Sequence, residues 1–95
     1  QLALLRRDPS LVAKLPDEFL RYDGTAQLVS RVTEAAVEIG GVTIPAGEQV
    51  FAMLGAGNCD PARYAELDRF DVMRADVQPL TFGGGVHFCL GAALA

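Results

Sequence analysis

The first quarter of the chain shows apolar residues at the spacing of a helix. Four of them lie on one face if residues 10–22 are helical: Leu11, Leu15, Phe19 and Leu20. Residues 1–7 are apolar with two arginines at their end, which is typical of the last turns of another helix. Residues 8–10 separate the two helices, because proline breaks a helix while aspartate and serine cap the next one. Pro16 either interrupts the second helix or lies in the first turn of a helix that begins there.

The middle of the chain changes to the alternation of β-strands. Residues 37–39 and 42–44 each place one polar residue between two β-branched apolar ones. The pair Gly40-Gly41 lies between them, so the pattern predicts a β-hairpin. Residues 49–54 predict a further strand after a proline–glycine turn. With the helices, these strands predict a mainly α chain with a small β-sheet, an α+β fold.

The stretch after the strands is rich in turn formers. Residues 55–60 are polar and glycine-rich, which predicts a turn. Residues 60–64 predict a short helical turn, because Pro61 suits the first position of a helix. Residues 71–81 are mixed and polar, which predicts a meander over the surface towards the last loop.

Length and charge narrow the range of functions. Ninety-five residues, 51% of them hydrophobic, suit one small domain. A formal net charge of −4 argues against nucleic acid or an anionic membrane as the main partner. No apolar run approaches the length that spans a bilayer, and no signal-peptide pattern is present. Because the sequence begins inside one predicted helix and ends inside another, residues 1–95 are expected to form a partial single domain, the carboxy-proximal part of a larger one.

The candidate chemistry gathers in residues 82–91, FGGGVHFCLG. Cys89 lies between three glycines and a run, residues 92–95, that favours a helix. Backbone N–H groups at the first turn of a helix favour the thiolate, the form of cysteine that binds metals. The glycines let the backbone bend sharply and approach a flat ligand closely. The alternatives are an inert cysteine beside a flexible loop and a phosphate cradle, although no lysine follows the glycines as a P-loop requires.

A charged pair precedes this loop on the second predicted helix. Glu18 and Arg21 are three residues apart and therefore share a face. Taken alone, they would be an exposed ion pair that contributes roughly a few tenths of a kcal/mol. Because the pair precedes the cysteine loop, it can also be interpreted together with that loop, as described below.

The spacing Phe82-x-x-Gly85-x-His87-x-Cys89-x-Gly91 resembles the haem-ligand signature of the cytochrome P450 family. The longer string FGGGVHFCLGAALA is similar to the form found in soluble bacterial members. The resemblance implies haem b (iron protoporphyrin IX) as the cofactor, with Cys89 as the axial ligand of the iron and the catalytic residue. It also implies that one aromatic residue and three glycines shape the pocket of the sulfur: Phe82, Gly83, Gly85 and Gly91.

The same resemblance assigns charged residues elsewhere in the chain. Glu18-Phe-Leu-Arg21 is similar to the ExxR motif of the family, in which the pair is buried beneath the haem. Arg69 matches the segment that supplies a third member, so it is expected to join Glu18 and Arg21. Arg31 and His87 fall where the family holds the haem propionates.

The second cysteine, Cys59, leaves further choices open. It could pair with Cys89, although a metal ligand is the favoured role for Cys89. Cys59 stands where soluble members often carry an arginine, in the string Asn-Cys-Asp-Pro, and is expected not to bind the metal. A zinc or structural module is poorly supported, because His87 and Cys89 are the only clustered ligands and a closed zinc site needs four.

The resemblance implies a cytoplasmic haem-thiolate monooxygenase that inserts one oxygen atom into a small apolar substrate. Leu28 and Val29 are expected on the substrate side of the haem. Electrons are expected from a ferredoxin or flavodoxin-like donor with its reductase, docked at the face near Cys89. Residues 1–95 alone are expected to show no turnover, because the oxygen-activating residues of the family lie outside them. The alternative is a haem-binding or electron-transfer relic that keeps the thiolate without substrate chemistry.

Overall fold

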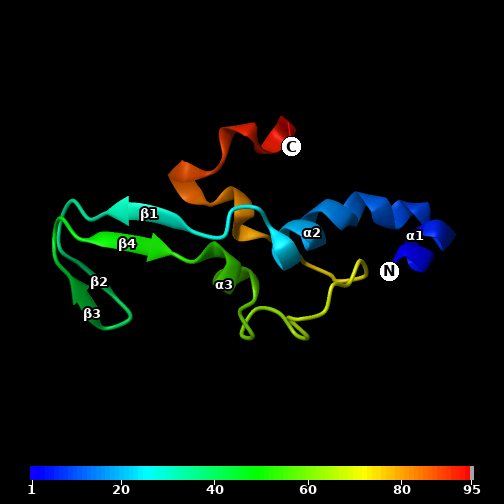
Figure 1. The fold of residues 1–95 in the computed structure, drawn as a ribbon, viewed down its shortest axis with the longest axis horizontal. Coiled ribbons are helices and arrows are strands. Elements are labelled where there is room, and N and C mark those ends of the chain that lie inside the picture. Colours follow the sequence, from blue (N-terminus) through cyan, green and yellow to red (C-terminus); the bar gives the residue numbers. More distant parts are fainter. Residues whose placement is uncertain (95) are drawn as a thin grey trace.

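The computed structural model describes residues 1–94, which form an elongated body of 54 × 29 × 17 Å. A helical arm lies at one end, a narrow β arm at the other, and the last loop folds over the middle (Figure 1). The two arms join at a small core beneath this loop. The mixture of helices and short strands confirms the predicted α+β class.

The helical arm contains three elements in chain order: α1 (Leu2–Arg7), the 3₁₀ helix η1 (Pro9–Lys14) and α2 (Leu15–Asp23). The expected break lies at Asp8, whose carboxylate accepts a hydrogen bond from the Ser10 N–H at 3.0 Å. The one helix predicted over residues 10–22 is divided into η1 and α2. Pro16 lies in the first turn of α2, where its missing N–H costs no hydrogen bond.

The β arm contains four short strands: β1 (Val29–Val32), β2 (Val37–Ile39), β3 (Val42–Ile44) and β4 (Gln49–Ala52). β1 pairs antiparallel with β4, and β2 pairs antiparallel with β3. Gly40 and Gly41 have φ angles of +59° and +78°, the left-handed conformation that a tight hairpin turn requires. The predicted hairpin is therefore confirmed. The strand predicted over residues 49–54 ends at Ala52.

A short helix, α3 (Leu54–Asn58), follows β4. The sequence predicts a turn over residues 55–60, so this prediction is wrong for most of the segment. Its glycines serve close packing instead of a turn. A Cβ on Gly57 would lie only 2.6 Å from Cδ1 of Leu80, so glycine lets the two segments approach.

The chain after α3 contributes more to the interior than its polarity suggests. Residues 60–64 form the expected helical turn, closed by a backbone hydrogen bond of 2.9 Å from residue 64 to residue 60. Residues 71–81 do not simply cross the surface, because Val72 and Thr81 are buried. Thr81 belongs to the 3₁₀ helix η2 (Leu80–Phe82), which packs on α2 and α3.

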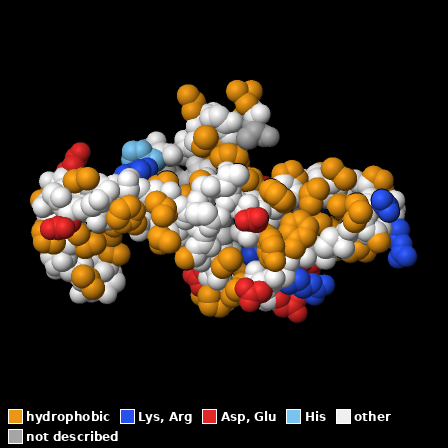
Figure 2. All heavy atoms as spheres, in the orientation of Figure 1, with side chains coloured by type: hydrophobic (Ala, Val, Ile, Leu, Met, Phe, Trp, Pro, Cys, Tyr) orange, Lys and Arg blue, Asp and Glu red, His pale blue; other side chains and the backbone are white. Residues whose placement is uncertain are grey.

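The core is small and unusually polar. Its buried side chains come from the helical arm, from α3 and from the segment that leads to the cysteine loop: Leu11, Glu18, Arg21, Asn58, Tyr64, Val72 and Thr81. Because buried polar groups are costly without partners, hydrogen bonds must connect these elements. Hydrophobic side chains also lie on the outer surface of both arms and near the last loop (Figure 2). Within residues 1–94, no helix is long and apolar enough to cross a membrane.

Candidate functional site

A hollow of about 560 Å³ lies between the β1–β4 ladder and the last loop. It collects six residues that the sequence assigns to cofactor or substrate: Val29, Arg31, Phe82, Gly83, His87 and Cys89. Val29 and Arg31 share a face of β1, because side chains alternate along a strand. Ala52, the cross-strand partner of Val29, lines the same wall. Residues that lie far apart in the sequence therefore meet in one cavity.

The last loop is closed at its base by a backbone hydrogen bond. The N–H of Cys89 donates to the carbonyl of Phe82 at 2.9 Å. Gly83 and Gly85 have φ angles of +70° and +59°, which are strained for residues with a Cβ. The loop therefore depends on glycine at these two positions to bring the ends together. The thiol of Cys89 is exposed, and it lines the hollow.

Short helical turns flank the cysteine. The 3₁₀ helix η3 (Gly85–His87) precedes it and the 3₁₀ helix η4 (Leu90–Leu94) follows it. The helical start that the sequence predicts after Cys89 is thus present as a 3₁₀ helix. Residue 95, the last of the predicted helical run, lies outside the described residues.

The composition of the hollow fits haem. The thiol of Cys89 is a soft donor for iron, and the loop before it presents bare backbone: a Cβ on Gly84 would meet no atom within 4 Å. The guanidinium of Arg31 and the imidazole of His87 can each donate a hydrogen bond into the hollow. Such donors suit the propionate carboxylates of a haem. The lining also includes apolar side chains, among them those of Ala52 and Leu54. A flat, mainly apolar ligand with a metal and carboxylates matches this set.

Three residues that the sequence assigns to the site do not line the hollow. Leu28 precedes β1 and is half-exposed, whereas its neighbour Val29 faces the cavity. Gly85 shapes the loop through its backbone angle. Gly91 lies next to the sulfur, since a Cβ there would be 3.9 Å from Sγ of Cys89. These two glycines therefore act on the loop and on the surroundings of the thiol.

The alternative roles of the two cysteines, a disulfide and a zinc or structural module, find little support. Cys59 and Cys89 are both free thiols, so they do not form the disulfide. Cys59 is partly buried and is not among the residues that line the hollow. Among residues 1–94, no three His, Cys, Asp or Glu side chains gather where they could hold a metal ion.

The Glu18–Arg21 pair is buried directly in the core, and each residue is 1% exposed. The guanidinium binds the carboxylate through two contacts, at 2.7 Å from Nε and 3.0 Å from Nη2. The backbone N–H of Asp71 adds a third hydrogen bond to Glu18 at 2.9 Å. Arg21 also donates to the carbonyls of Asn58 and Leu67, at 3.2 and 3.1 Å. The pair thus connects α2 to α3 and to the segment that follows.

These contacts decide the charge state of the pair. Burial alone raises the pKa of Glu18, but hydrogen bonds from Arg21, the Asp71 N–H and Arg74 outweigh burial and hold that pKa below its ordinary value. The hydrogen bond to Glu18 raises the pKa of Arg21, against the opposite effect of burial. Both groups are therefore charged at neutral pH despite being inside the protein.

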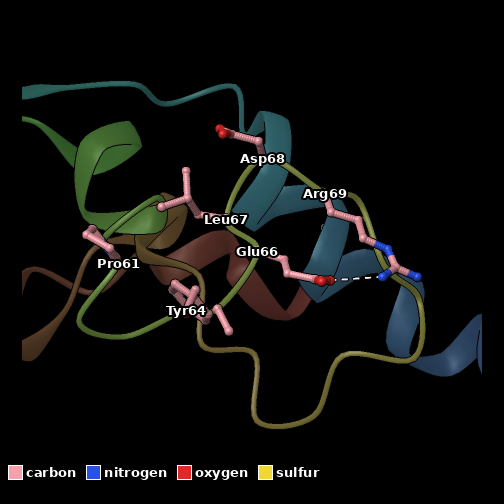
Figure 3. A pocket seen from close by; sticks show the side chains of 7 residues that line it. Pro61, Tyr64, Glu66, Leu67, Asp68 and Arg69 are labelled. Atoms are coloured by element: carbon pink, nitrogen blue, oxygen red, sulfur yellow. Dashed lines mark hydrogen bonds and ion pairs between the residues drawn. The ribbon is translucent and has the colours of Figure 1, made fainter.

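Arg69 does not join the pair through its side chain, so this expectation is wrong. Its side chain is 58% exposed, and its guanidinium contacts Glu66 at 2.9 Å and Asp71 at 3.9 Å. Figure 3 shows the Glu66–Arg69 ion pair beside a shallow hollow on residues 61–69. Only the backbone carbonyl of Arg69 reaches the core, where it accepts a hydrogen bond from Arg21 at 3.2 Å.

Arg74 takes the place expected for Arg69. Its Nε donates to the Glu18 carboxylate at 3.3 Å, and its side chain is only 12% exposed. Its other nitrogens bind three carbonyls of the preceding loop, including that of Arg69 at 3.0 Å. The sequence contains both arginines, but only the path of the folded loop shows which of them contacts Glu18.

Comparison with known proteins extends these observations. A family model described as cytochrome P450 matches residues 10–95. The biotin biosynthesis cytochrome P450 of Bacillus subtilis is 44% identical over 95 residues, which are 100% of this chain and 24% of the relative. The 6-deoxyerythronolide B hydroxylase of Saccharopolyspora erythraea is 45% identical over 95 residues, with the same coverage of both chains. The chain thus spans about a quarter of the length of these curated relatives.

A solved structure shows the same fold. It is the crystal structure of P450BioI in complex with hexadec-9Z-enoic acid ligated acyl carrier protein. It is 44% identical to this chain, with a TM-score of 0.95 over 99% of this chain and 25% of that one. Since the family model matches nearly the whole chain and the fold agrees with that of a solved member, this chain belongs to the cytochrome P450 family.

Proposed function

We propose that this chain is the haem-binding, carboxy-proximal part of a monooxygenase that inserts one oxygen atom into an apolar organic substrate. The observation that carries the proposal is the hollow in which the Cys89 thiol meets two basic side chains and a glycine-rich loop. Cys89 is the proposed axial ligand of haem b. When bound, this haem supplies the activation of O₂ and the transfer of an oxygen atom, favoured by the thiolate that pushes electron density onto iron.

The loop residues prepare the thiolate. The N–H of Cys89 is already used by the carbonyl of Phe82, which fixes the backbone of the cysteine. Gly91 leaves space beside the sulfur, since a Cβ there would already be in van der Waals contact with it. Backbone N–H groups around Cys89 would then hydrogen-bond the sulfur and set its electron donation, as outer hydrogen bonds do for metal ligands generally.

Arg31 and His87 are the proposed partners of the propionates. Arg31 is anchored on β1, where its Nη1 donates to the carbonyl of Ser30 at 2.7 Å. His87 approaches the hollow from the loop. Two donors from different elements would orient the macrocycle as well as bind it, because each fixes one edge.

The apolar character of the substrate rests on the wall of the cavity and on relatives. Val29 lines the hollow, and the P450BioI complex carries hexadec-9Z-enoic acid. Electrons are proposed to come from a ferredoxin or flavodoxin-like donor with its reductase, in the cytoplasm. The family of the chain and the bacterial origin of its relatives support these last assignments.

The test is an absorption spectrum of the protein purified with haem, reduced and treated with CO. Thiolate ligation moves the Soret band strongly to the red. Replacement of the thiolate by imidazole in Cys89→His should retain some haem and abolish the red-shifted band, because imidazole donates less charge. Cys59→Ser is the matched control and should keep the band.

The outcomes separate the candidate functions. A red-shifted band that persists in Cys89→His would exclude Cys89 as the ligand. No haem spectrum in any preparation would favour a structural or zinc module. A red-shifted band without product formation, in a preparation of the longer monooxygenase proposed to contain this chain and supplied with electron donor and substrate, would favour the haem-binding relic over the monooxygenase.

A further inference from the structure

A buried amide side chain connects the interior to the segment that leads into the cysteine loop. Asn58, at the end of α3, is 2% exposed. Its Oδ1 accepts a hydrogen bond from the N–H of Leu80 at 2.7 Å. Its Nδ2 donates to the carbonyl of Leu20 and to Oγ1 of Thr81, both at 3.4 Å. One side chain therefore contacts the end of α2 and the start of η2.

Thr81 completes the connection from the other side. Its hydroxyl donates to the carbonyl of Leu20 at 2.8 Å, and the residue is buried. A Cβ on Gly24 would lie 2.2 Å from this hydroxyl, and one on Gly57 would lie 2.6 Å from Leu80. η2 is thus seated in a notch between two glycines, and the hydrogen bonds fix it there.

The position of η2 fixes the two backbone carbonyls to which the cysteine loop is hydrogen-bonded at its base. The carbonyl of Leu80 accepts from the N–H of Gly83 at 2.7 Å. Two residues after Leu80, the carbonyl of Phe82 accepts from the N–H of Cys89. A shift of η2 would therefore displace the acceptor that holds the backbone of the cysteine.

The same residue also contacts the buried ion pair. The backbone carbonyl of Asn58 accepts a hydrogen bond from Nη1 of Arg21 at 3.2 Å. The Glu18–Arg21 pair, α3 and η2 are consequently joined through one position. Interactions in one hydrogen-bonded network are coupled, so a change at Asn58 is transmitted to both sides.

We propose that Asn58 and Thr81 are positioning residues that hold the cysteine loop where the Cys89 sulfur bonds the haem iron. The inference rests on the proposed function, since it requires a haem thiolate. The two side chains act through Leu80 and Phe82. Neither side chain contacts the sulfur in these hydrogen bonds, whose partners are Leu80 and Leu20. The two side chains fix the position of the sulfur through the backbone of the loop.

The test uses the haem-loaded protein and compares four variants. Asn58→Leu removes the amide at similar volume, Thr81→Val removes the hydroxyl, and Thr81→Ser retains it. Thr43→Val, on the exposed hairpin, is the matched control. The readout is the ratio of the red-shifted thiolate band to the band of haem without thiolate in the reduced CO complex, at equal haem content.

The expected ratios follow from the lost hydrogen bonds. Asn58→Leu leaves the N–H of Leu80 without its acceptor in the partly buried contact with Asn58 and should lower the ratio about tenfold, whereas Thr81→Val should lower it roughly fivefold. Thr81→Ser should restore most of the ratio, and Thr43→Val should equal the wild type. A role in stability alone would reduce the yield of folded haem protein without changing the ratio in what remains.

Clear results would overturn the inference. Folded Asn58→Leu and Thr81→Val proteins with the wild-type ratio would show that the loop does not depend on these side chains. If Asn58→Leu does not fold, the Thr81 variants decide: a wild-type ratio in Thr81→Val overturns the inference, and a loss that Thr81→Ser restores supports it. A wild-type protein without any thiolate band would contradict the proposed function instead.

Discussion

The exchange of roles between Arg69 and Arg74 can be tested through stability. Each arginine is replaced by methionine, which keeps most of the apolar stem and removes the guanidinium. Arg74 is largely buried and donates to the interior carboxylate of Glu18, whereas Arg69 pairs with Glu66 at the surface. Arg74→Met should therefore destabilise the protein much more than Arg69→Met.

The magnitudes follow from the contacts. The carbonyls of Ala65 and Glu66 lie in an exposed loop, so water can replace the arginine there, and the carbonyl of Arg69 keeps its hydrogen bond from Arg21. The contact with Glu18 has no such replacement, and losing a hydrogen bond to a buried charge costs about 1.5–3 kcal/mol. The exposed Arg69 pair should contribute only ~0–1 kcal/mol, because solvent screens it.

Urea unfolding followed by circular dichroism measures the difference. With a slope of about 1–3 kcal/mol per M, a loss of ~2 kcal/mol lowers the midpoint by roughly 0.7–2 M, while Arg69→Met should stay close to wild type. The slope itself should be the same in all three proteins. A larger loss in Arg69→Met than in Arg74→Met would refute the assignment of Arg74 to the buried network.

Two further perturbations test the core. Because the folded pKa of Glu18 lies below its ordinary value, the stability that this group contributes is present above about pH 4.3, the usual value for glutamate, and is lost as the pH falls through the folded pKa. The urea midpoint of the wild type should fall as the pH is lowered from neutral to acidic, and the midpoint of Glu18→Gln should change less. An equal fall of the midpoint with pH in the two proteins would contradict the assignment. Gly24→Ala places a methyl against Thr81 and the carbonyl of Leu20, so it should cost about 1–3 kcal/mol in thermal unfolding. Gly84→Ala, which meets no atom within 4 Å, should melt like the wild type, and similar losses in both would argue against the notch.

Local patterns predicted the elements whose causes are local. The hairpin follows from apolar alternation around Gly40-Gly41, and both glycines have the positive φ that this turn needs. The break at Asp8 follows from proline and a capping carboxylate. The buried Glu18–Arg21 pair was expected only from a family resemblance, because an i,i+3 pair alone says nothing about burial.

Predictions failed where tertiary packing overrides local preference. Gly57 suggested a turn, yet it lies in α3, where glycine is needed because Leu80 approaches too closely for a side chain. The loop that carries Arg74 to Glu18 includes Glu66 with a φ of +48°, a conformation that glutamate rarely adopts and that no sequence signal indicates. Thr81 is buried for a similar reason, since its hydroxyl serves a carbonyl of α2 that is distant in sequence.

The central claim is that the sulfur of Cys89 bonds the iron of haem. X-ray absorption at the iron edge of the haem-loaded ferric protein tests it directly, because it reports the atoms bonded to the metal. The account predicts one sulfur in the iron coordination shell at about 2.3 Å, typical of metal–thiolate bonds, in the wild type and in Cys59→Ser, and none in Cys89→His. A wild-type spectrum without sulfur at bonding distance, or sulfur retained in Cys89→His, would contradict it.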